Sequence, residues 1–208
     1  LIWFSRTWSR LLLHVAGAEV ATSGTEHVPD HDRILVVSNH QSFADIPLLQ
    51  GYIDKPFGFL AKADLERVPI LGPWMRAYGC VFIDRGNLRT AHRTIDLAAA
   101  AVRSGVPLVV FPEGTRSKGG PPRRFKSGTF RIAYQAQATI VPVTVDGVAD
   151  LLERQGHVHS ARLQLTVHPP IDYAAYADLP VTQIADQVEA IVRAGLRSRT
   201  NTGVPTHR

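Results

Sequence analysis

His40 and Asp45 are the side chains of this 208-residue sequence best placed to perform acid–base chemistry. His40 comes just after the apolar run 34–38, and Asp45 follows five residues later. A turn between them lets the carboxylate hold one imidazole nitrogen, so that the other nitrogen can take a proton from a hydroxyl group. The pair therefore predicts a general base with its orienting carboxylate, an arrangement that requires no protein nucleophile.

The five-residue spacing is not specific by itself. His27 is followed by Asp32, and His14 by Glu19, at the same offset. Of these histidines, only His40 lies beyond the end of an apolar strand, where α/β proteins place their sites. The alternative for His40 is a histidine that caps the end of a strand or a helix.

Three further apolar runs are each followed by a cation, namely Lys62, Arg85 and Arg116. If these strand ends share one edge of a sheet with His40, they form a crevice with one base and three cations. Such a crevice favours an anionic substrate that carries a hydroxyl group. The alternatives are local ion pairs, of Arg116 with Glu113 and of Arg85 with the aspartate before it.

Short apolar runs alternate with helical patterns along most of the chain, which indicates a single α/β domain. We expect strands at 34–38, 57–61, 80–83, 107–111, 139–145 and 162–167. We expect helices at 44–50, 71–78, 88–104, 128–137 and 182–199, with a polar loop at 117–126. The predicted architecture is a mixed, mostly parallel central sheet flanked by helices.

Residues 1–21 have the periodicity of an amphipathic helix. One stripe is apolar and contains Phe4, Trp8, Leu11, Leu12 and Val15. The pattern fits a helix packed on the core of the domain, and it fits equally a helix that lies on a membrane surface. Charged residues interrupt the segment too often for a membrane span, and its longest apolar block is too short for a signal peptide.

Composition narrows the class of protein. An apolar fraction of 45% with 20% charged residues excludes a disordered chain, a collagen-like fibre and a polytopic membrane protein. The single cysteine, Cys80, excludes an intrachain disulfide, and its apolar neighbours indicate a core residue rather than a nucleophile. The net charge of +5 favours anionic partners. A nucleic-acid binder is disfavoured, because the aromatic residues after the first helix are not interleaved with cations.

Five segments resemble, in order, the sequence blocks of glycerolipid acyltransferases, and most of all the bacterial 1-acyl-glycerol-3-phosphate acyltransferases. These segments are 39–45, 59–79, 82–85, 111–117 and 141–143. The resemblance covers residues 24–147, and its most specific parts are NHQSFAD and FPEGTRS. We therefore expect an acyltransferase domain at 24–200, preceded by a membrane-associating helix at 1–23 and followed by a loose tail at 201–208.

The resemblance implies transfer of a fatty acyl group from a thioester donor, acyl-CoA or acyl-carrier protein, to the free hydroxyl of lysophosphatidic acid. The product is phosphatidic acid. His40 is implied as the general base and Asp45 as its orienting partner, with no covalent intermediate. Arg85 and Arg116 are implied to bind the acceptor phosphate, and Lys62 to contact that phosphate or the developing oxyanion.

Other residues are implied in supporting roles. Glu113, Gly114 and Thr115 support the acceptor site. Candidates for the donor site are Pro142 and three cations of the polar loop, whose alternative role is simple solvation: Lys118, Arg124 and Lys126. No cofactor is expected beyond the thioester co-substrate, and no metal, since three histidines elsewhere are too scattered to favour one: His157, His159 and His168.

The expected partners are the lysophospholipid acceptor, the thioester donor and a membrane surface, and the oligomeric state is not predicted. The expected location is the cytoplasmic face of the cell membrane, with the protein either peripheral or anchored by an upstream segment. Two alternatives remain. One is acylation of a different lysolipid, and the other is a non-catalytic lipid-binding module, which does not require the His40–Asp45 pair.

Overall fold

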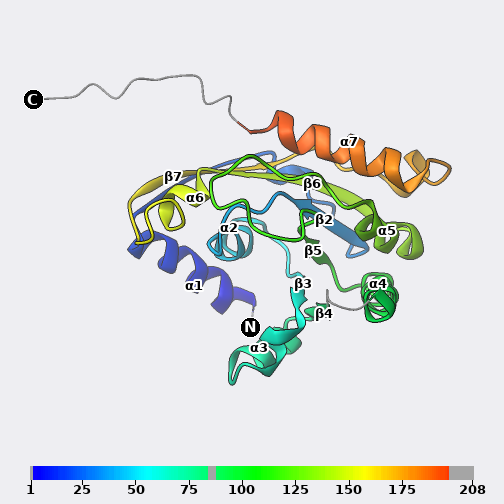
Figure 1. Cartoon of the computed structure of the whole chain (residues 1–208), viewed down its shortest axis with the longest axis horizontal. Coiled ribbons are helices and arrows are strands. Elements are labelled where there is room, and N and C mark those ends of the chain that lie inside the picture. Colours follow the sequence, from blue (N-terminus) through cyan, green and yellow to red (C-terminus); the bar gives the residue numbers. More distant parts are fainter. Residues whose placement is uncertain (1, 84–87, 197–208) are drawn as a thin grey trace, which may run out of the picture.

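Seven strands form one sheet in the order β1-β7-β6-β2-β5-β3-β4 (Figure 1). The computed structural model describes residues 2–83 and 88–196, with side chains from 3 to 83 and from 92 to 196. β6 and β7 are antiparallel, and every other neighbouring pair is parallel. The strands are β1 (Ala18–Ser23), β2 (Ile34–Ser38), β3 (Gly58–Lys62), β4 (Val81–Ile83), β5 (Leu108–Val110), β6 (Thr139–Asp146) and β7 (Ala161–Val167). The predicted mixed, mostly parallel sheet is confirmed.

Helices cover both faces of this sheet. The α-helices are α1 (Ile2–Val15), α2 (Asp45–Tyr52), α3 (Leu71–Ala77), α4 (Leu88–Arg103), α5 (Arg131–Ala136), α6 (Val148–Leu151) and α7 (Val181–Ala194). Short 3-10 helices are η1 (Thr25–His27), η2 (Ala63–Arg67), η3 (Ser127–Phe130) and η4 (Tyr173–Ala175). Helices α4, α5 and α7 lie on one face, and α1, α2 and α6 lie on the other (Figure 1).

The central strand β2 shows why the sheet needs a layer of helices on each face. All five of its residues are buried. Leu35 and Val37 enter the core beneath α4, α5 and α7, whereas Ile34 and Val36 enter the core beneath α1 and α2. A strand buried on both faces has a continuous apolar sequence, and this is the pattern that predicted it.

The carboxyl ends of β2, β5 and β3 lie at the same edge of the sheet because these neighbouring strands are parallel. Val37 pairs with both Val110 of β5 and Pro142 of β6. The segments that follow β2 and β5 therefore emerge side by side. This topology brings the turn at 39–45 against the turn at 111–117.

The N-terminal segment differs from its prediction. The helix expected over 1–21 ends at Val15, and residues 18–23 form the edge strand β1, which pairs with β7. Helix α7 ends at Ala194 rather than at 199, and the expected tail at 201–208 lies outside the described residues. The remaining expected strands and helices are present, with bounds that differ by a few residues.

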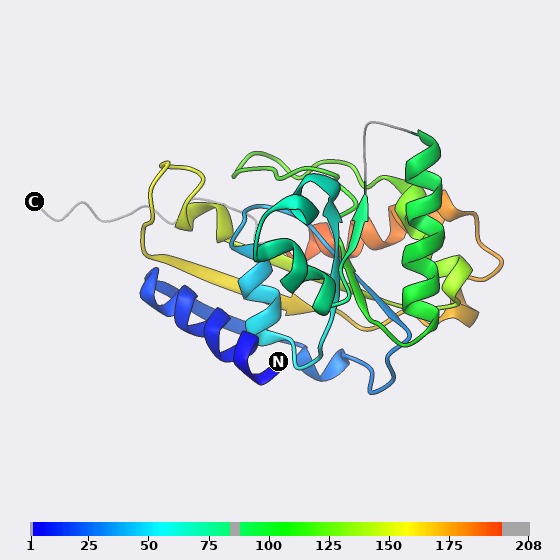
Figure 2. The same cartoon turned by 90° about the horizontal axis from the view of Figure 1, so that it is seen from below.

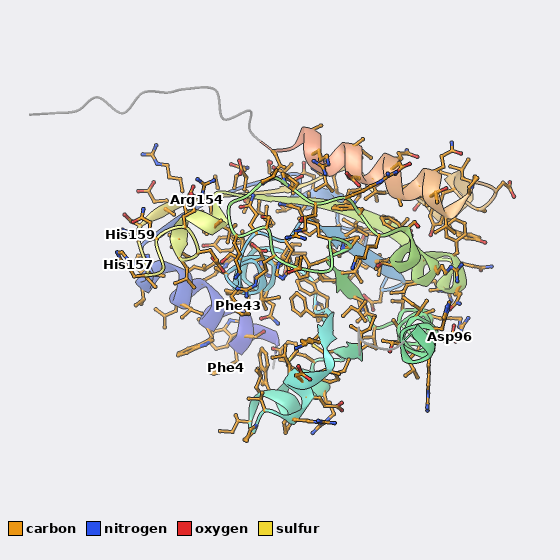
Figure 3. The ribbon with its side chains drawn as sticks, viewed as in Figure 1. Phe4, Phe43, Asp96, Arg154, His157 and His159 are labelled. Atoms are coloured by element: carbon orange, nitrogen blue, oxygen red, sulfur yellow. The ribbon has the colours of Figure 1, made fainter. Side chains whose placement is uncertain are left out.

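The outer face of α1 is apolar. Its inner face consists of Ser5, Ser9 and Leu13, which are buried. The expected apolar stripe, together with Trp3, instead faces away from the domain, with exposed fractions from 49% to 78% for Trp3, Phe4, Trp8, Leu11, Leu12 and Val15. Figure 3 places Phe4 on the side of α1 turned away from the sheet. Packing of this stripe on the domain core is therefore contradicted.

Candidate active site

His40 and Asp45 form the predicted pair. The Nδ1 atom of His40 lies 2.7 Å from Oδ2 of Asp45, whose side chain is fully buried at the first residue of α2. The backbone N–H groups of Gln41 and Ser42 donate to the same Oδ2, at 2.7 and 3.0 Å. Burial raises the pKa of Asp45, and the hydrogen bonds from His40, Ser42 and Gln41 oppose that rise. The tight turn between strand and helix thus fixes the carboxylate on the imidazole.

The imidazole ring is held from a second direction by Phe111. The two rings stack with centroids 4.0 Å apart and planes 15° from parallel. With Nδ1 on Asp45, Nε2 is the nitrogen left to exchange a proton with a substrate. The His40 side chain keeps 18% of its surface exposed.

The backbone of His40 is fixed by the turn after β5. Its N–H donates to Oε1 of Glu113 at 2.9 Å, and its carbonyl accepts from the N–H of Ser117 at 2.8 Å. The other Glu113 oxygen accepts the N–H of Arg123 at 3.0 Å. Glu113 is buried and does not pair with Arg116, so the local ion pair considered from the sequence is not formed. Glu113 instead joins three chain segments beneath the turn that follows β2.

The buried position of Glu113 has a consequence for stability. Burial raises its pKa above the ordinary carboxyl value. A raised folded-state pKa means that the folded protein binds the proton more tightly than the unfolded chain does. The stabilising contribution is therefore present near and below the unfolded pKa of about 4.3 and is lost as the pH rises through the folded pKa.

We expect the wild-type free energy of unfolding to fall relative to that of Glu113→Gln as the pH rises across this window, since glutamine does not titrate. Urea denaturation at a series of pH values measures the difference. Glu26→Gln, at an exposed carboxylate, is the matched control and should track the wild type. Parallel pH profiles for the wild type and Glu113→Gln would contradict the role of burial.

Arg116 lies beside the same turn but binds a residue that the sequence did not suggest. Its Nη1 atom donates to Oε1 of Glu153 at 3.2 Å, and its guanidinium carbon lies 3.5 Å from the centre of the Phe43 ring. The Phe43 N–H donates to the same Glu153 oxygen at 3.0 Å. Glu153 follows α6 and is largely buried. A guanidinium carries five N–H donors, so this contact leaves others to meet an anion.

The other expected acceptor-site residues are only partly brought together. Lys62 ends β3 at the same edge of the sheet, but its exposed ammonium pairs with Asp64 and thereby lowers the pKa of that carboxyl. Thr115 is exposed on the turn. Arg85 lies outside the described residues.

Gly114 permits the turn to close. Its φ is +74°, and a Cβ built there would come within 2.8 Å of Nζ of Lys126. The backbone conformation therefore favours glycine at this position, whereas the flexible end of the lysine could move aside.

A cavity of about 710 Å³ is lined in part by Phe111, at the start of the turn after β5. Its lining includes the apolar side chains of Leu60, Ile83 and Ile95, together with hydroxyl and basic side chains from η3, α4, α5 and the start of α7. Lys126 lines the cavity. The cavity therefore has both apolar and cationic lining, and its lining residue Phe111 also stacks on His40.

The other donor-site candidates do not line this cavity. Pro142 is buried within β6 beside Val37. Arg124 points to α7, where it pairs with Asp186 at 3.2 Å. Lys118 is exposed, and its N–H donates to the carbonyl of Gln41 at 3.1 Å.

The polar loop is fastened to α7. Glu189 accepts the N–H of Phe125 at 2.7 Å, and Arg193 donates to the carbonyl of Pro122 at 3.0 Å. The second half of the loop is therefore held in place.

Four residues of the site were missed from the sequence. Phe43 and Phe111 lie inside the segments 39–45 and 111–117, so their closeness in sequence to the predicted site residues could have indicated them. Asn39 exchanges two hydrogen bonds with the backbone of Val145, at 2.8 and 2.9 Å, and so docks the turn after β2 onto β6. Glu153 lies in a polar stretch with no motif, and nothing local in the sequence points to it.

The remaining chemical candidates lie elsewhere. His157 and His159 contact each other in the loop after α6, with their ring planes tilted by 50°, at the far end of the molecule from α4 (Figure 3). No group of three potential metal ligands occurs among the described residues. Cys80 is partly buried, and burial raises its pKa, which disfavours a nucleophilic thiolate. Its Sγ accepts the N–H of Phe59 at 3.3 Å, a hydrogen bond that opposes this rise without cancelling it.

Fold and sequence together define the class of this protein. The family model named Acyltransferase matches residues 19–146, which includes both turns of the site. The chain belongs to the acyltransferase family and is therefore a transferase, as the sequence segments indicated.

Relatives with a more specific name share most of the chain. The 1-acyl-sn-glycerol-3-phosphate acyltransferase of Borreliella burgdorferi is 31% identical over 80% of this chain and 67% of its own length. A probable enzyme of the same name from Mycoplasma pneumoniae is 31% identical over 86% of this chain and 71% of its own. The crystal structure of the 1-acyl-sn-glycerophosphate acyltransferase PlsC from Thermotoga maritima superposes with a TM-score of 0.80 at 28% identity, covering 93% of this chain and 77% of that one.

Proposed function

We propose that this protein transfers a fatty acyl group from a thioester donor to the free hydroxyl of lysophosphatidic acid. The observation that carries the proposal is the His40–Asp45 pair, with Nδ1 fixed at 2.7 Å from the carboxylate, beside the guanidinium of Arg116. Phe43 links the two groups, because it lies in the turn between His40 and Asp45 and contacts Arg116 through its ring. The names of the relatives support the same acceptor.

The proposed mechanism needs only one proton carrier. Nε2 of His40 takes the proton of the acceptor hydroxyl as its oxygen attacks the thioester carbonyl. The carbon–sulfur bond then breaks, and the imidazolium returns the proton to the departing thiolate, whose conjugate thiol has a pKa of about 8.5. Asp45 stabilises the imidazolium formed between these steps. No covalent acyl-enzyme is required.

The proposed place of the acyl donor is the cavity lined by Phe111. Its apolar lining suits a fatty acyl chain, and its cationic residues, which include Lys126, suit the phosphate that acyl-CoA and acyl-carrier protein both carry on their pantetheine arm. Either donor supplies the acyl group as a co-substrate, so no cofactor is required.

We further propose that α1 lies on the membrane at its cytoplasmic face, whether or not an upstream segment also anchors the protein. The supporting observation is its orientation, since its serine face packs inward and its tryptophan-rich face is exposed. Within the described part of the chain, no helix is both long and apolar enough to cross a bilayer. The apolar side chains of α1 thus suit the interfacial layer of one leaflet.

The decisive experiment is thiol release from palmitoyl-CoA, with lysophosphatidic acid compared against phosphate-free monoacylglycerol. Release that requires the phosphate acceptor supports the proposal. Equal release with both acceptors favours a broader lysolipid acyltransferase. No release with palmitoyl-CoA or with a palmitoyl carrier protein favours a lipid-binding module.

Arg116→Ala is expected to lower kcat/KM for lysophosphatidic acid about 10- to 150-fold, because one charge-assisted hydrogen bond of about 1.5–3 kcal/mol is lost. The rate with monoacylglycerol should change far less. Arg162→Ala, at an exposed arginine paired with Glu19 on the far edge of the sheet, is the matched control. An equal loss with both acceptors would show that Arg116 does not bind the phosphate.

A further inference from the structure

The segment between η2 and α3 projects apolar side chains into solvent. Ile70 is 87% exposed, and Val68, Leu71 and Trp74 are each more than a third exposed. The helix α3 that follows buries only Gly72 and Met75 against the domain. Residues 68–74, called here the apolar tip, therefore carry far more exposed apolar surface than a short connection between elements needs.

Ile70 also has an unfavourable backbone conformation. Its φ is +67° and its ψ is −50°, and the N–H of Leu71 donates to the carbonyl of Pro69 at 2.7 Å. This is a γ-turn of the positive-φ type, which is rare, and a β-branched residue at its centre is an outlier. In most proteins such strain is compensated by burial, but the Ile70 side chain makes almost no contact with the rest of the chain.

The apolar tip is nevertheless held firmly in place. The N–H of Gly72 donates to the carbonyl of Val68 at 2.9 Å, and that of Trp74 donates to the carbonyl of Ile70 at 3.1 Å. A Cβ at Gly72 would lie 2.0 Å from the carbonyl oxygen of Glu66, so the turn packs directly on η2. Ile70 is thus fixed in an outward position by the backbone around it.

The tip and α1 lie on the same side of the molecule. Figure 1 shows α1 and α3 below the sheet, and the view from below in Figure 2 shows both in front of it. The sequence contains three tryptophans, and all of them lie in these two elements: Trp3, Trp8 and Trp74. Tryptophan is enriched at the boundary between membrane and water, where its apolar ring contacts lipid and its indole N–H can donate a hydrogen bond. Exposed Arg67 flanks the tip and suits anionic headgroups, whereas Arg76 on its other side pairs with Glu66 at 3.3 Å.

We propose that the apolar tip inserts into the membrane interface as a second anchor beside α1, with Ile70 as the deepest side chain. The inference rests on the proposed membrane association of α1 and extends it. Lys62 ends β3 immediately before η2, so insertion of the tip places this ammonium at headgroup level. Two separated contacts also fix the orientation of the sheet edge toward the bilayer, which one helix alone does not.

Ile70→Gly removes the apolar side chain without disturbing the fold, because glycine adopts positive φ without strain. Its melting temperature should equal or exceed that of the wild type. Its binding to vesicles of phosphatidylethanolamine and phosphatidylglycerol, measured by sedimentation, should weaken about tenfold. Ile70→Asn should weaken binding at least as much. Leu97→Asn, at a 54% exposed leucine of α4, is the matched control and should bind as the wild type does.

A second readout locates the tip directly. In a Trp3→Phe, Trp8→Phe variant, Trp74 is the sole tryptophan, and its fluorescence should shift to the blue on vesicle binding and be quenched by brominated lipids. Wild-type binding by both Ile70 variants, or an unchanged Trp74 spectrum on bound vesicles, would overturn the proposal. Loss of self-association in Ile70→Asn, without any effect on vesicles, would overturn it in favour of a protein interface. Neither measurement requires acyl transfer, so failure here is distinct from failure of the proposed reaction.

Discussion

His40→Ala is expected to lower kcat for acyl transfer about 10²–10⁴-fold, the usual contribution of a general base. The KM for lysophosphatidic acid should change little, because the acceptor phosphate is assigned to Arg116 rather than to the imidazole. The reason is geometric. Nδ1 is committed to Asp45, the ring is stacked on Phe111, and Nε2 is the nitrogen that remains to carry the proton. Initial rates of thiol release over a range of acceptor concentrations separate the two parameters.

His27→Ala is the matched control for this prediction. His27 has an aspartate at the same spacing, but its Nδ1 lies 3.0 Å from the carbonyl of Val167, and Asp32 pairs with Lys55 at 3.1 Å. Its removal should leave kcat unchanged. Two results would contradict the assigned mechanism: a His40→Ala enzyme with wild-type kcat, or a covalent acyl-enzyme detected by mass spectrometry during turnover.

The comparison of His40 with His27 shows how far sequence alone could predict the site. Both histidines have the spacing, and only the apolar strand before His40 distinguished them. That strand was predictable because burial on both faces leaves a continuous apolar run. The position of Asp45 followed from the turn. What the spacing could not give was the support of His40 by Glu113 and Phe111, because these contacts depend on the pairing of β2 with β5.

Glu153 illustrates a contact that the sequence could not predict. It lies 37 residues from Arg116, after a short helix that the hydropathy pattern did not indicate. The sequence instead suggested Glu113 as the ion-pair partner, since that residue is close along the chain. The carboxylate of Glu113 is directed to backbone N–H groups because the turn exposes those donors next to it.

The N-terminal error has a related physical cause. Residues 18–23 form an edge strand whose side chains are mostly exposed, so they lack the apolar run that marked the central strands. The amphipathic period of α1 was correctly recognised, but periodicity does not say which face points inward. Ser5 and Ser9 allow α1 to approach α2 closely, while Arg10 donates to the carbonyl of Gly51 at 2.7 Å. The small and polar face therefore packs on the domain, and the apolar face is left outside.

Asp45→Asn is expected to lower kcat about 10²–10³-fold while the position of the His40 ring is retained. All three hydrogen bonds to this carboxylate converge on Oδ2, and within the described residues Oδ1 accepts none. An asparagine carbonyl at the Oδ2 position can therefore accept the same three N–H groups. The substitution removes the negative charge, keeps the acceptor and places the amide NH2 in the buried position of Oδ1, so the loss mainly measures stabilisation of the imidazolium.

Asp45→Ala removes the charge and the acceptor together, so its kcat should fall further than that of Asp45→Asn. The difference between the two variants measures how much orientation of the ring contributes. Melting temperatures recorded beside the rates separate this effect from unfolding, because Gln41 and Ser42 lose their acceptor only in the alanine variant. Wild-type kcat in Asp45→Asn would show that orientation suffices and that the charge is dispensable. Equal kcat in both variants would show the reverse, since the carbonyl acceptor would then contribute nothing beyond the charge.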